Sequence, residues 1–123
     1  MPHQAVTALC AWLKERHAAI MACEKNALQA LYEDKNQALY ETLMRNKAEA
    51  VAALDTDAAS LLEALPDAAR NEAQSALHRF SSSARNGLRI GSVFYYSSLL
   101  YPDEHTDGEP DNLERLILEL EHS

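Results

Sequence analysis

Glycine and proline are scarce in this sequence. Its 123 residues include three Gly and four Pro, while hydrophobic residues make up 47% of the chain. This composition excludes collagen-like proteins and glycine-rich linkers, and it supplies enough apolar side chains for a folded core. A chain of this length typically forms one small core. We therefore expect a globular protein.

Long apolar runs and a signal-like N-terminus are also missing. No apolar stretch approaches the roughly 20 residues that a bilayer-spanning helix needs, so we expect no membrane span. The charged residues 14–16 interrupt the apolar pattern early, which argues against a secretory signal. Cys10 and Cys23 lie in one expected helix, about 20 Å apart, which is too far for a disulfide. Reduced cysteines fit the cytoplasm, and this is the location we expect.

Basic residues are too few for a nucleic-acid-binding protein. The chain carries 11 Lys and Arg against 19 Asp and Glu, a formal net charge of −8. The excess of acidic residues lies at the end of the chain, because residues 1–101 carry a net charge of −1 and residues 102–123 a net charge of −7. Nucleic-acid binding depends on Lys and Arg that neutralise phosphates. We therefore expect no nucleic-acid partner.

Helix-forming residues dominate the segment between Pro2 and Pro66, which contains no Gly. Its apolar residues recur every three or four positions, as in a helix with one buried face. One straight helix of this length would span about 95 Å, too long for so small a domain. We therefore expect a turn at 33–36 and a kink or short turn at 55–57. The apolar positions are Val6, Leu9, Leu13, Ile20, Leu28, Leu31, Leu39, Leu43, Val51, Leu54, Leu61 and Leu65.

A second long helix is predicted from about Pro66 to about Leu100. Pro66 suits a first turn, and an apolar stripe follows it. Gly87 and Gly91 lie four residues apart on one face. This spacing is equally consistent with a close helix crossing and with loose local packing. The stripe consists of Ala69, Ala73, Ala76, Leu77, Phe80, Ala84, Leu88, Tyr95 and Leu99.

A short amphipathic helix is predicted at the C-terminus, after a polar link at 102–110. Asp111 and Asn112 suit its N-cap, and four apolar residues share one face. The fold class is therefore all-α: an antiparallel up-and-down bundle of long helices in residues 1–101, followed in residues 102–123 by an acidic link and the short helix. Such a helix docks on its own bundle or on another protein. The four apolar residues are Leu113, Leu116, Ile117 and Leu120.

The link overlaps a damaged calcium-loop pattern at residues 103–114. A twelve-residue calcium loop needs oxygen ligands at spaced positions and Gly at position 6. Here His105 stands at position 3, where an oxygen ligand is needed, and Pro110 stands at an apolar position. A solvated acidic link is the favoured interpretation, with calcium binding as the alternative. The matching residues are Asp103, Asp107, Gly108, Asp111 and Glu114.

Sequence patterns for catalysis, metals and nucleotides are absent. The five histidines show no metal-binding spacing, and the three glycines form no phosphate loop. Ser81–Ser83 lies within a predicted helix and lacks the glycine-flanked turn that exposes a nucleophile. We therefore expect no enzyme activity, no metal and no other cofactor. Trp12, Phe80, Phe94 and Tyr95 are expected in the core, and Tyr32 and Tyr40 partly exposed near the first turn.

Two segments resemble the FlgN family of flagellar type III export chaperones. The first runs from Glu24-Lys25-Asn26-Ala27-Leu28 through Asp34, and it continues to Leu39, Leu43 and a basic residue that is either Arg45 or Lys47. The second is Ser83-Ala84-Arg85-Asn86-Gly87-Leu88 followed by Ile90. Ser83 stands where the family tends to have Asn. Asn86 and Gly87 are the family-motif positions, and their expected role is helix packing.

The resemblance implies a cytoplasmic, non-enzymatic chaperone. Such a protein binds helical segments of hook-associated (hook–filament junction) proteins before export, in contact with the export apparatus. Leu113, Leu116, Ile117 and Leu120 are the predicted partner contacts, in a helix-in-groove mode. The acidic flank would discourage self-association and steer basic partners. A homodimeric scaffold bundle is the alternative, and a calcium-responsive module is a third hypothesis.

Overall fold

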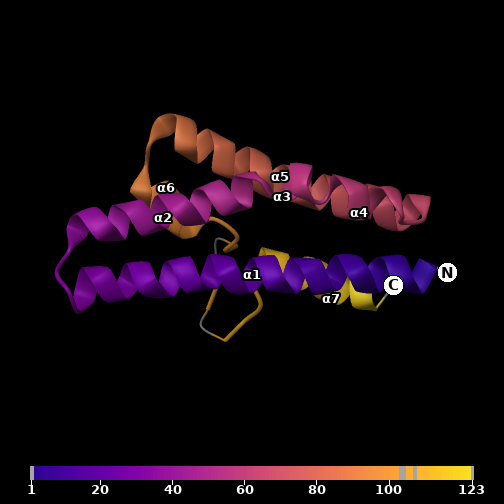
Figure 1. Cartoon of the computed structure of the whole chain (residues 1–123), viewed down its shortest axis with the longest axis horizontal. Helices are drawn as coiled ribbons and strands as arrows, with labels where there is room; N and C mark the ends of the chain where they lie inside the picture. The colour runs from indigo at the N-terminus through magenta and orange to yellow at the C-terminus, as the bar shows by residue number, and fades with distance from the viewer. Residues whose placement is uncertain (1, 103–104, 107, 123) are drawn as a thin grey trace.

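The computed structural model describes residues 2–102, 105–106 and 108–122, with only the backbone for residues 2 and 3. Within these ranges the chain forms seven helices and no strand (Figure 1). The helices are α1 (Pro2–Tyr32), α2 (Gln37–Ala52), α3 (Leu54–Asp57), α4 (Ala59–Glu63), α5 (Asp67–Ile90), α6 (Val93–Ser98) and α7 (Asn112–Glu121).

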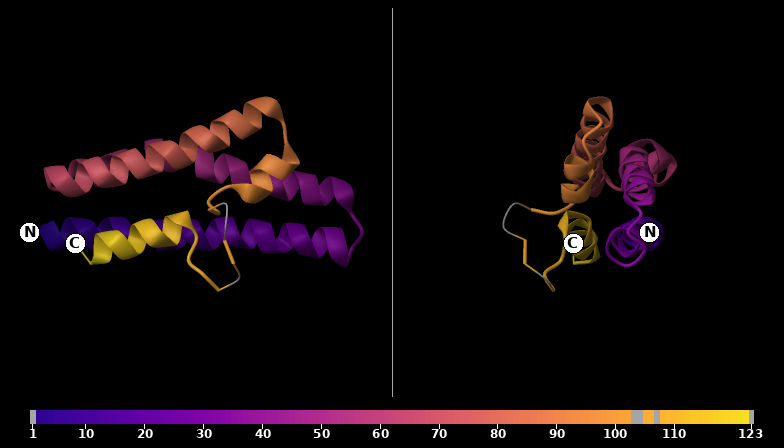
Figure 2. Two further views of the ribbon diagram at one scale, coloured as in Figure 1. Left: turned by 180° about the vertical axis from the view of Figure 1, so that it is seen from behind. Right: turned by 90° about the vertical axis from the view of Figure 1, so that its left-hand side faces the viewer.

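The helices form an antiparallel bundle. In Figure 1, α1 runs the length of the molecule, and α2, α3 and α4 return beside it as one bent rod. Helix α5 runs back again, and α7 lies antiparallel to the N-terminal half of α1. The end-on view in Figure 2 shows α1, α2, α5 and α7 around a common centre. The predicted all-α bundle with a short C-terminal helix is therefore confirmed.

The first long helical segment is interrupted in two regions, near the two predicted positions. At 33–36 the chain turns, with Lys35 in the left-handed region (φ 53°), and the Asn36 side chain accepts a hydrogen bond from the Leu39 amide. The second interruption consists of breaks at Ala53 and Ala58, on either side of α3. The kink or short turn expected at 55–57 is therefore replaced by two breaks that flank this position, because residues 55–57 are themselves helical.

The side chain of Ser81 on α5 bridges the break in the helical segment at Ala53. Its hydroxyl donates to the Val51 carbonyl at 2.8 Å and accepts from the Asp55 amide at 3.1 Å. Arg85, one turn further along α5, forms two hydrogen bonds to the Asp55 carboxylate. The hydrogen bond with Arg85 is the main reason that the pKa of Asp55 is lowered. The buried serine of α5 therefore bonds to backbone groups on both sides of the break at Ala53.

The prediction of one helix from Pro66 to Leu100 is wrong. Helix α5 ends at Ile90, because Gly91 adopts a left-handed conformation (φ 77°) that suits a glycine C-cap. The chain then reverses into α6, whose N-cap Ser92 accepts a hydrogen bond from the Tyr95 amide. The apolar stripe stays in phase across the break, so hydrophobic periodicity alone does not reveal it.

The two glycines of α5 have different roles. A Cβ atom on Gly87 would lie 2.7 Å from the Tyr95 ring, so this glycine permits the close approach of α6. A Cβ atom on Gly91 would meet nothing within 4 Å, and its backbone conformation is the reason for glycine there. The predicted close crossing is therefore confirmed at Gly87, and Gly91 acts as a helix terminator.

One hydrophobic cluster connects the long helices with α7. Most of the predicted apolar stripe belongs to it, but Leu28 and Leu39 are about two-fifths exposed near the first turn. Phe94 was predicted to lie in the core, which is wrong, because it is 83% exposed at the start of α6. Tyr32 is exposed and Tyr40 is half-buried, as predicted. Across the described part of the chain, the helices lack the length and apolar character that spanning a membrane requires.

The substitution Gly87→Ala should destabilise the protein by about 1 kcal/mol. Alanine favours a helix by about 1 kcal/mol over glycine, but the displaced Tyr95 ring costs about 1–3 kcal/mol through overpacking. Ser83→Ala, one turn earlier and exposed, is the matched control. Urea unfolding of both variants checks the difference. If Gly87→Ala proves as stable as Ser83→Ala, the close contact is not what selects glycine.

Candidate functional site: the seat of the C-terminal helix

Helix α7 begins with a complete capping box. The Asp111 carboxylate accepts a hydrogen bond from the Glu114 amide at 2.8 Å, and the Glu114 carboxylate accepts from the Asp111 amide at 3.0 Å. These reciprocal bonds satisfy two amides that have no partner inside the helix. The predicted cap at Asp111–Asn112 is confirmed. Because both bonds are local, α7 keeps its N-terminal cap wherever it docks.

The apolar face of α7 lies in the core of its own bundle. Its residues pack between α1 and α5, whereas Leu118 on the opposite face is 44% exposed. The four residues predicted as partner contacts therefore offer no free surface in this structure, and a partner would reach them only after α7 has left its seat. They are Leu113, Leu116, Ile117 and Leu120, with exposed fractions of 0%, 3%, 5% and 1%.

Polar contacts hold α7 against α1 at both of its ends. At the N-terminal end, His17 Nε2 lies 2.8 Å from Asp111 Oδ2. At the C-terminal end, the Lys14 ammonium donates to the Glu121 carboxylate at 2.7 Å, in a pair that is largely exposed. Between them, Cys10 Sγ lies 4.0 Å from the Ile117 carbonyl oxygen. The helix is thus fixed in both register and direction.

The contact between His17 and Asp111 favours the charged form of both groups. The hydrogen bond to Asp111 raises the pKa of His17, against the opposing effect of burial. Burial would raise the pKa of Asp111, but the hydrogen bonds from His17 and the Glu114 amide lower it overall. Because Asp111 is only 2% exposed, this pair is less screened than a surface ion pair.

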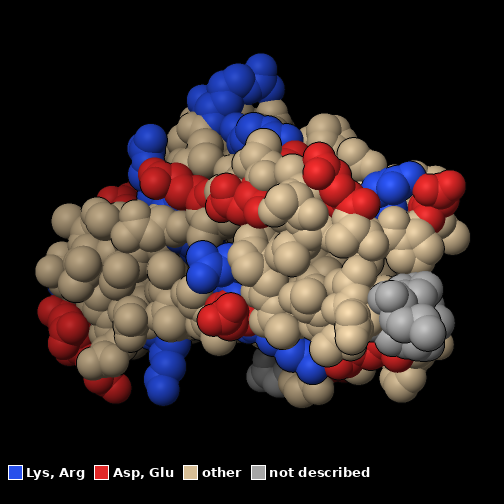
Figure 3. Space-filling view, turned by 45° about the vertical axis from the view of Figure 1, so that its right-hand side comes forward, with Lys and Arg blue, Asp and Glu red and all other residues tan. Residues whose placement is uncertain are grey.

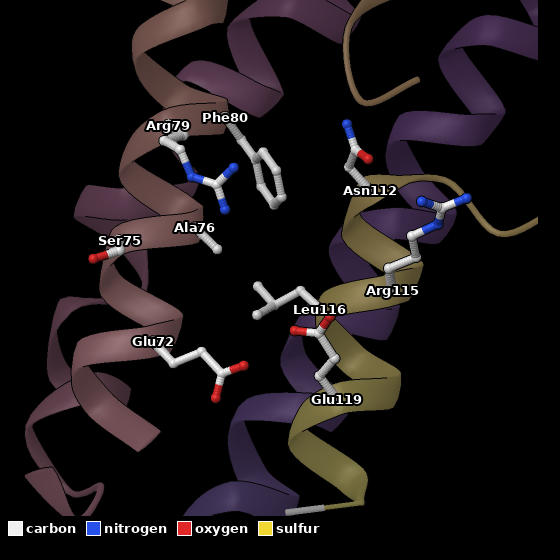
Figure 4. A pocket seen from close by; sticks show the side chains of 9 residues that line it. All are labelled: Glu72, Ser75, Ala76, Arg79, Phe80, Asn112, Arg115, Leu116 and Glu119. Atoms are coloured by element: carbon white, nitrogen blue, oxygen red, sulfur yellow. The ribbon is translucent and has the colours of Figure 1, made fainter. Parts of the chain in front are cut away.

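Two hollows border the seated helix. One, of about 390 Å³, lies between α5 and α7, where Ala76 and Phe80 face Leu116 (Figure 4). Its rim is mixed in charge, because Glu72 and Arg79 lie on α5 and Arg115 and Glu119 lie on α7. The other, of about 330 Å³, lies between α1 and α7 beside His17. The seat is therefore not closed on either side of α7.

The chain that leads into α7 is anchored by a partly buried polar cluster. The Tyr101 hydroxyl donates to the Glu24 carboxylate at 2.8 Å. The Lys47 ammonium donates to the Ser97 carbonyl at 3.2 Å, lies 3.7 Å from Glu24, and lies 5.0 Å from the centre of the Tyr101 ring. The Asn112 amide donates to the Leu100 carbonyl at 2.7 Å. These contacts connect α1 and α2 with α6 and Tyr101, just before the link, and they connect Leu100 with the start of α7.

Lys47 is the charged member of this cluster with no exposed surface. Burial lowers its pKa, and the nearby Glu24 carboxylate partly offsets that effect. Burial and the hydrogen bond to Glu24 raise the pKa of Tyr101. A lysine with a lowered pKa can act as a nucleophile or base, but no substrate reaches a side chain that is wholly enclosed. The arrangement is therefore suited to anchoring the link.

The residues of the calcium-loop pattern are used in other ways where the structure describes them. Asp111 and Glu114 cap α7, and His105 Nε2 lies 2.8 Å from the Glu109 carbonyl oxygen. Asp103 and Asp107, also named in the prediction, lie outside the described residues. Calcium binding therefore stays an untested alternative.

The family-motif residues lie away from α7, in the last turns of α5. The Asn86 side chain accepts a hydrogen bond from Arg89, and the Gly87 carbonyl accepts one from the Gly91 amide at 2.8 Å. The structure therefore separates Asn86 and Gly87 from the four predicted contact residues on α7 (Figure 1). Of the two basic alternatives in the motif, Arg45 is exposed and pairs with Glu49, whereas Lys47 is buried.

Sequence reasoning missed His17, Glu24, Lys47 and Tyr101 as parts of one site. Lys47 had a signal, because it lies in phase with Met44 and Val51 on the buried face of α2. His17 had none, because its partner Asp111 is 94 residues away. Contacts of that separation become visible only once the bundle is assembled.

Charge is mixed over the surface that Figure 3 shows. Lys and Arg side chains gather along its upper edge, and Asp and Glu form a row below them. A broad uncharged area crosses the middle of this face, interrupted by a basic and an acidic side chain that lie close together. This distribution agrees with the near-zero net charge of residues 1–101.

The comparisons with known proteins give no relative. No family model matches the chain, and neither a curated protein nor a solved structure resembles it significantly.

The substitution Ile117→Asp should lower the free energy of unfolding by about 3 kcal/mol or more. It places a carboxylate without a partner in the buried seat, where an unpaired charge is costly. Leu118→Asp, the adjacent residue on the exposed face, should change stability by about 0.5 kcal/mol or less. Thermal and urea unfolding compare the two variants. Equal effects would contradict the burial of α7.

The substitution Lys47→Ala should destabilise the protein by about 2–4 kcal/mol. It removes the packed lysine stem and the positive charge beside Glu24, which leaves a cavity and an uncompensated carboxylate. Lys25→Ala is the matched control, because Lys25 is exposed on α1. Urea unfolding measures both. A Lys47→Ala variant as stable as the control would show that the polar cluster does not anchor the link.

Proposed function

We propose that the protein is a cytoplasmic, non-enzymatic chaperone that binds helical segments of flagellar hook–filament junction proteins before type III export. The similarity of residues 24–47 and 83–90 to the FlgN family supports this class of partner. The seat of α7 is the observation that supports a helix-binding mode, because it already accommodates an amphipathic helix.

The seat has the properties of a helix-binding groove. It lies between α1 and α5, it buries the apolar side chains of α7, and it is bordered by hollows of about 390 and about 330 Å³. An amphipathic helix of a partner fits such a groove through apolar residues at helical spacing. In this proposal α7 occupies the groove until a partner helix replaces it.

The attachment of α7 is suited to exchange. The Lys14–Glu121 pair is largely exposed, and a surface ion pair contributes only about 0.2–1 kcal/mol. The capping box consists of contacts within the chain segment 111–114, so it is not lost when α7 leaves. Release therefore costs the apolar burial and the His17–Asp111 contact, and a partner helix would restore the burial.

The acidic segment that accompanies α7 fits the same role. Residues 102–123 carry a net charge of −7, whereas the rest of the chain is almost neutral. When α7 is displaced, like-charge repulsion between such segments opposes association of two copies. The exposed apolar stripe would then be available to a partner but would be disfavoured as a dimer contact.

Calorimetric titration of the full-length protein with a purified hook–filament junction protein tests the proposal, with Ile117→Ala as the diagnostic variant. Loss of a buried Ile side chain weakens docking of α7 by about 2–5 kcal/mol. If the partner takes the seat, its apparent affinity should rise by about tenfold or more, because the competent state becomes more populated. Leu118→Ala, on the exposed face, should leave the affinity unchanged.

The other outcomes are equally clear. Weaker binding by a folded Ile117→Ala variant would place the apolar stripe of α7 in direct contact with the partner, and the chaperone function would stand. Absence of a complex at about 100 µM, a concentration that reveals even weak recognition, would contradict the proposal. A concentration-independent dimer in sedimentation without partner binding would favour the homodimeric scaffold.

A further inference from the structure

Three potential metal ligands from opposite ends of the chain meet at the start of α7. His17 Nε2 lies 2.8 Å from Asp111 Oδ2 and 3.8 Å from Glu114 Oε1. All three ligand atoms lie within 4.8 Å of one another. His17 comes from α1, and the two carboxylates come from the N-terminus of α7. No other such group of His, Cys, Asp and Glu occurs among the described residues.

The hydrogen bonds of the capping box hold the two carboxylate ligands in place. One oxygen of Asp111 accepts the Glu114 amide, which leaves Oδ2 directed at His17. Glu114 is fixed in turn by the Asp111 amide. The Asp111 side chain is 2% exposed and the His17 side chain 18% exposed, so water competes little for these two groups. The capping box thus preorganises both carboxylates.

The distances suit a small divalent ion. Zn²⁺ binds His nitrogen and carboxylate oxygen at about 2.0–2.2 Å, which places neighbouring ligands of a tetrahedral site about 3.3–3.5 Å apart. The ion would replace the proton between His17 Nε2 and Asp111 Oδ2, which would be released to solvent; the 2.8 Å contact would then open slightly and the 3.8 Å contact would close slightly. The hollow of about 330 Å³ beside His17 and Glu114 gives room for a water molecule as fourth ligand.

We propose that His17, Asp111 and Glu114 bind one divalent transition-metal ion, with Zn²⁺ as the best fit. Imidazole nitrogen favours Zn²⁺ and related ions, whereas Ca²⁺ and Mg²⁺ take oxygen ligands. The geometry therefore opposes calcium at Asp111 and Glu114, although both belong to the calcium-loop pattern. The bound ion connects α1 to α7 and stabilises the seated helix. This proposal does not depend on the chaperone function.

Titration of the full-length, chelator-treated protein with Zn²⁺, Ca²⁺ and Mg²⁺ tests the site. Calorimetry should detect one Zn²⁺ per chain, and the melting temperature should rise with Zn²⁺ concentration because only the folded state presents the three ligands together. Ca²⁺ and Mg²⁺ should leave it unchanged. His17→Ala and Asp111→Asn should each weaken Zn²⁺ binding by at least about tenfold. Asn retains the N-cap, so the second variant keeps α7 intact.

The control variant is His78→Ala, which removes an exposed histidine far from the cluster in sequence and should leave Zn²⁺ binding unchanged. Visible absorption of the Co²⁺-substituted protein gives a second readout, whose tetrahedral bands should disappear with His17→Ala. Unchanged melting without heat of binding would overturn the proposal. So would Zn²⁺ binding that survives both His17→Ala and Asp111→Asn, or a thiolate-to-cobalt band that reveals cysteine ligation.

Discussion

Burial of the apolar face of α7 between α1 and α5 is the interaction on which the rest of the structure depends. It joins the two ends of the chain, since Lys14 pairs with Glu121 across 107 residues. Without α7, the faces of α1 and α5 that surround Cys10 and Phe80 would lose their apolar cover. Helix α7, the shortest of α1, α2, α5 and α7, therefore completes the bundle shown in Figure 2.

The polar cluster around Lys47 explains why α7 docks in one register. An apolar stripe tolerates a shift by one turn, because a turn of three or four residues brings similar side chains to the same place. A buried ammonium and a partly buried carboxylate do not tolerate such a shift, because each loses its partner. Tyr101 and Ser97 connect this cluster to the link, so the link enters α7 from a fixed point. Direction and register thus come from polar contacts, and cohesion comes from apolar ones.

Local chemistry made much of the fold predictable from the sequence. Asn36, Pro66 and Asp111 mark helix starts through the hydrogen bonds or dihedral angles that these residue types favour. The break at Gly91 was missed because the apolar stripe continues in phase across it. Phe94 was misplaced for a different reason, because it was assigned to the core as a large aromatic residue and not from the apolar stripe. The cluster of His17, Asp111 and Glu114 was out of reach, because it forms only when α7 packs on α1.

The amphipathic pattern of the last helix illustrates a limit of sequence patterns in assigning function. Leucine and isoleucine at helical spacing predict that a face is buried, but they do not say against which molecule. Which molecule buries the face depends on two conditions. The link must be long enough to bring the helix back to its own bundle, and the bundle must leave an apolar surface uncovered by its other helices. Both conditions hold here. In the proposed function, burial of Ile117 in its own fold and binding of a partner helix are alternative states of one groove. The contacts of His17 and Lys14 with α7 set the balance between them, because they stabilise only the state in which α7 is seated.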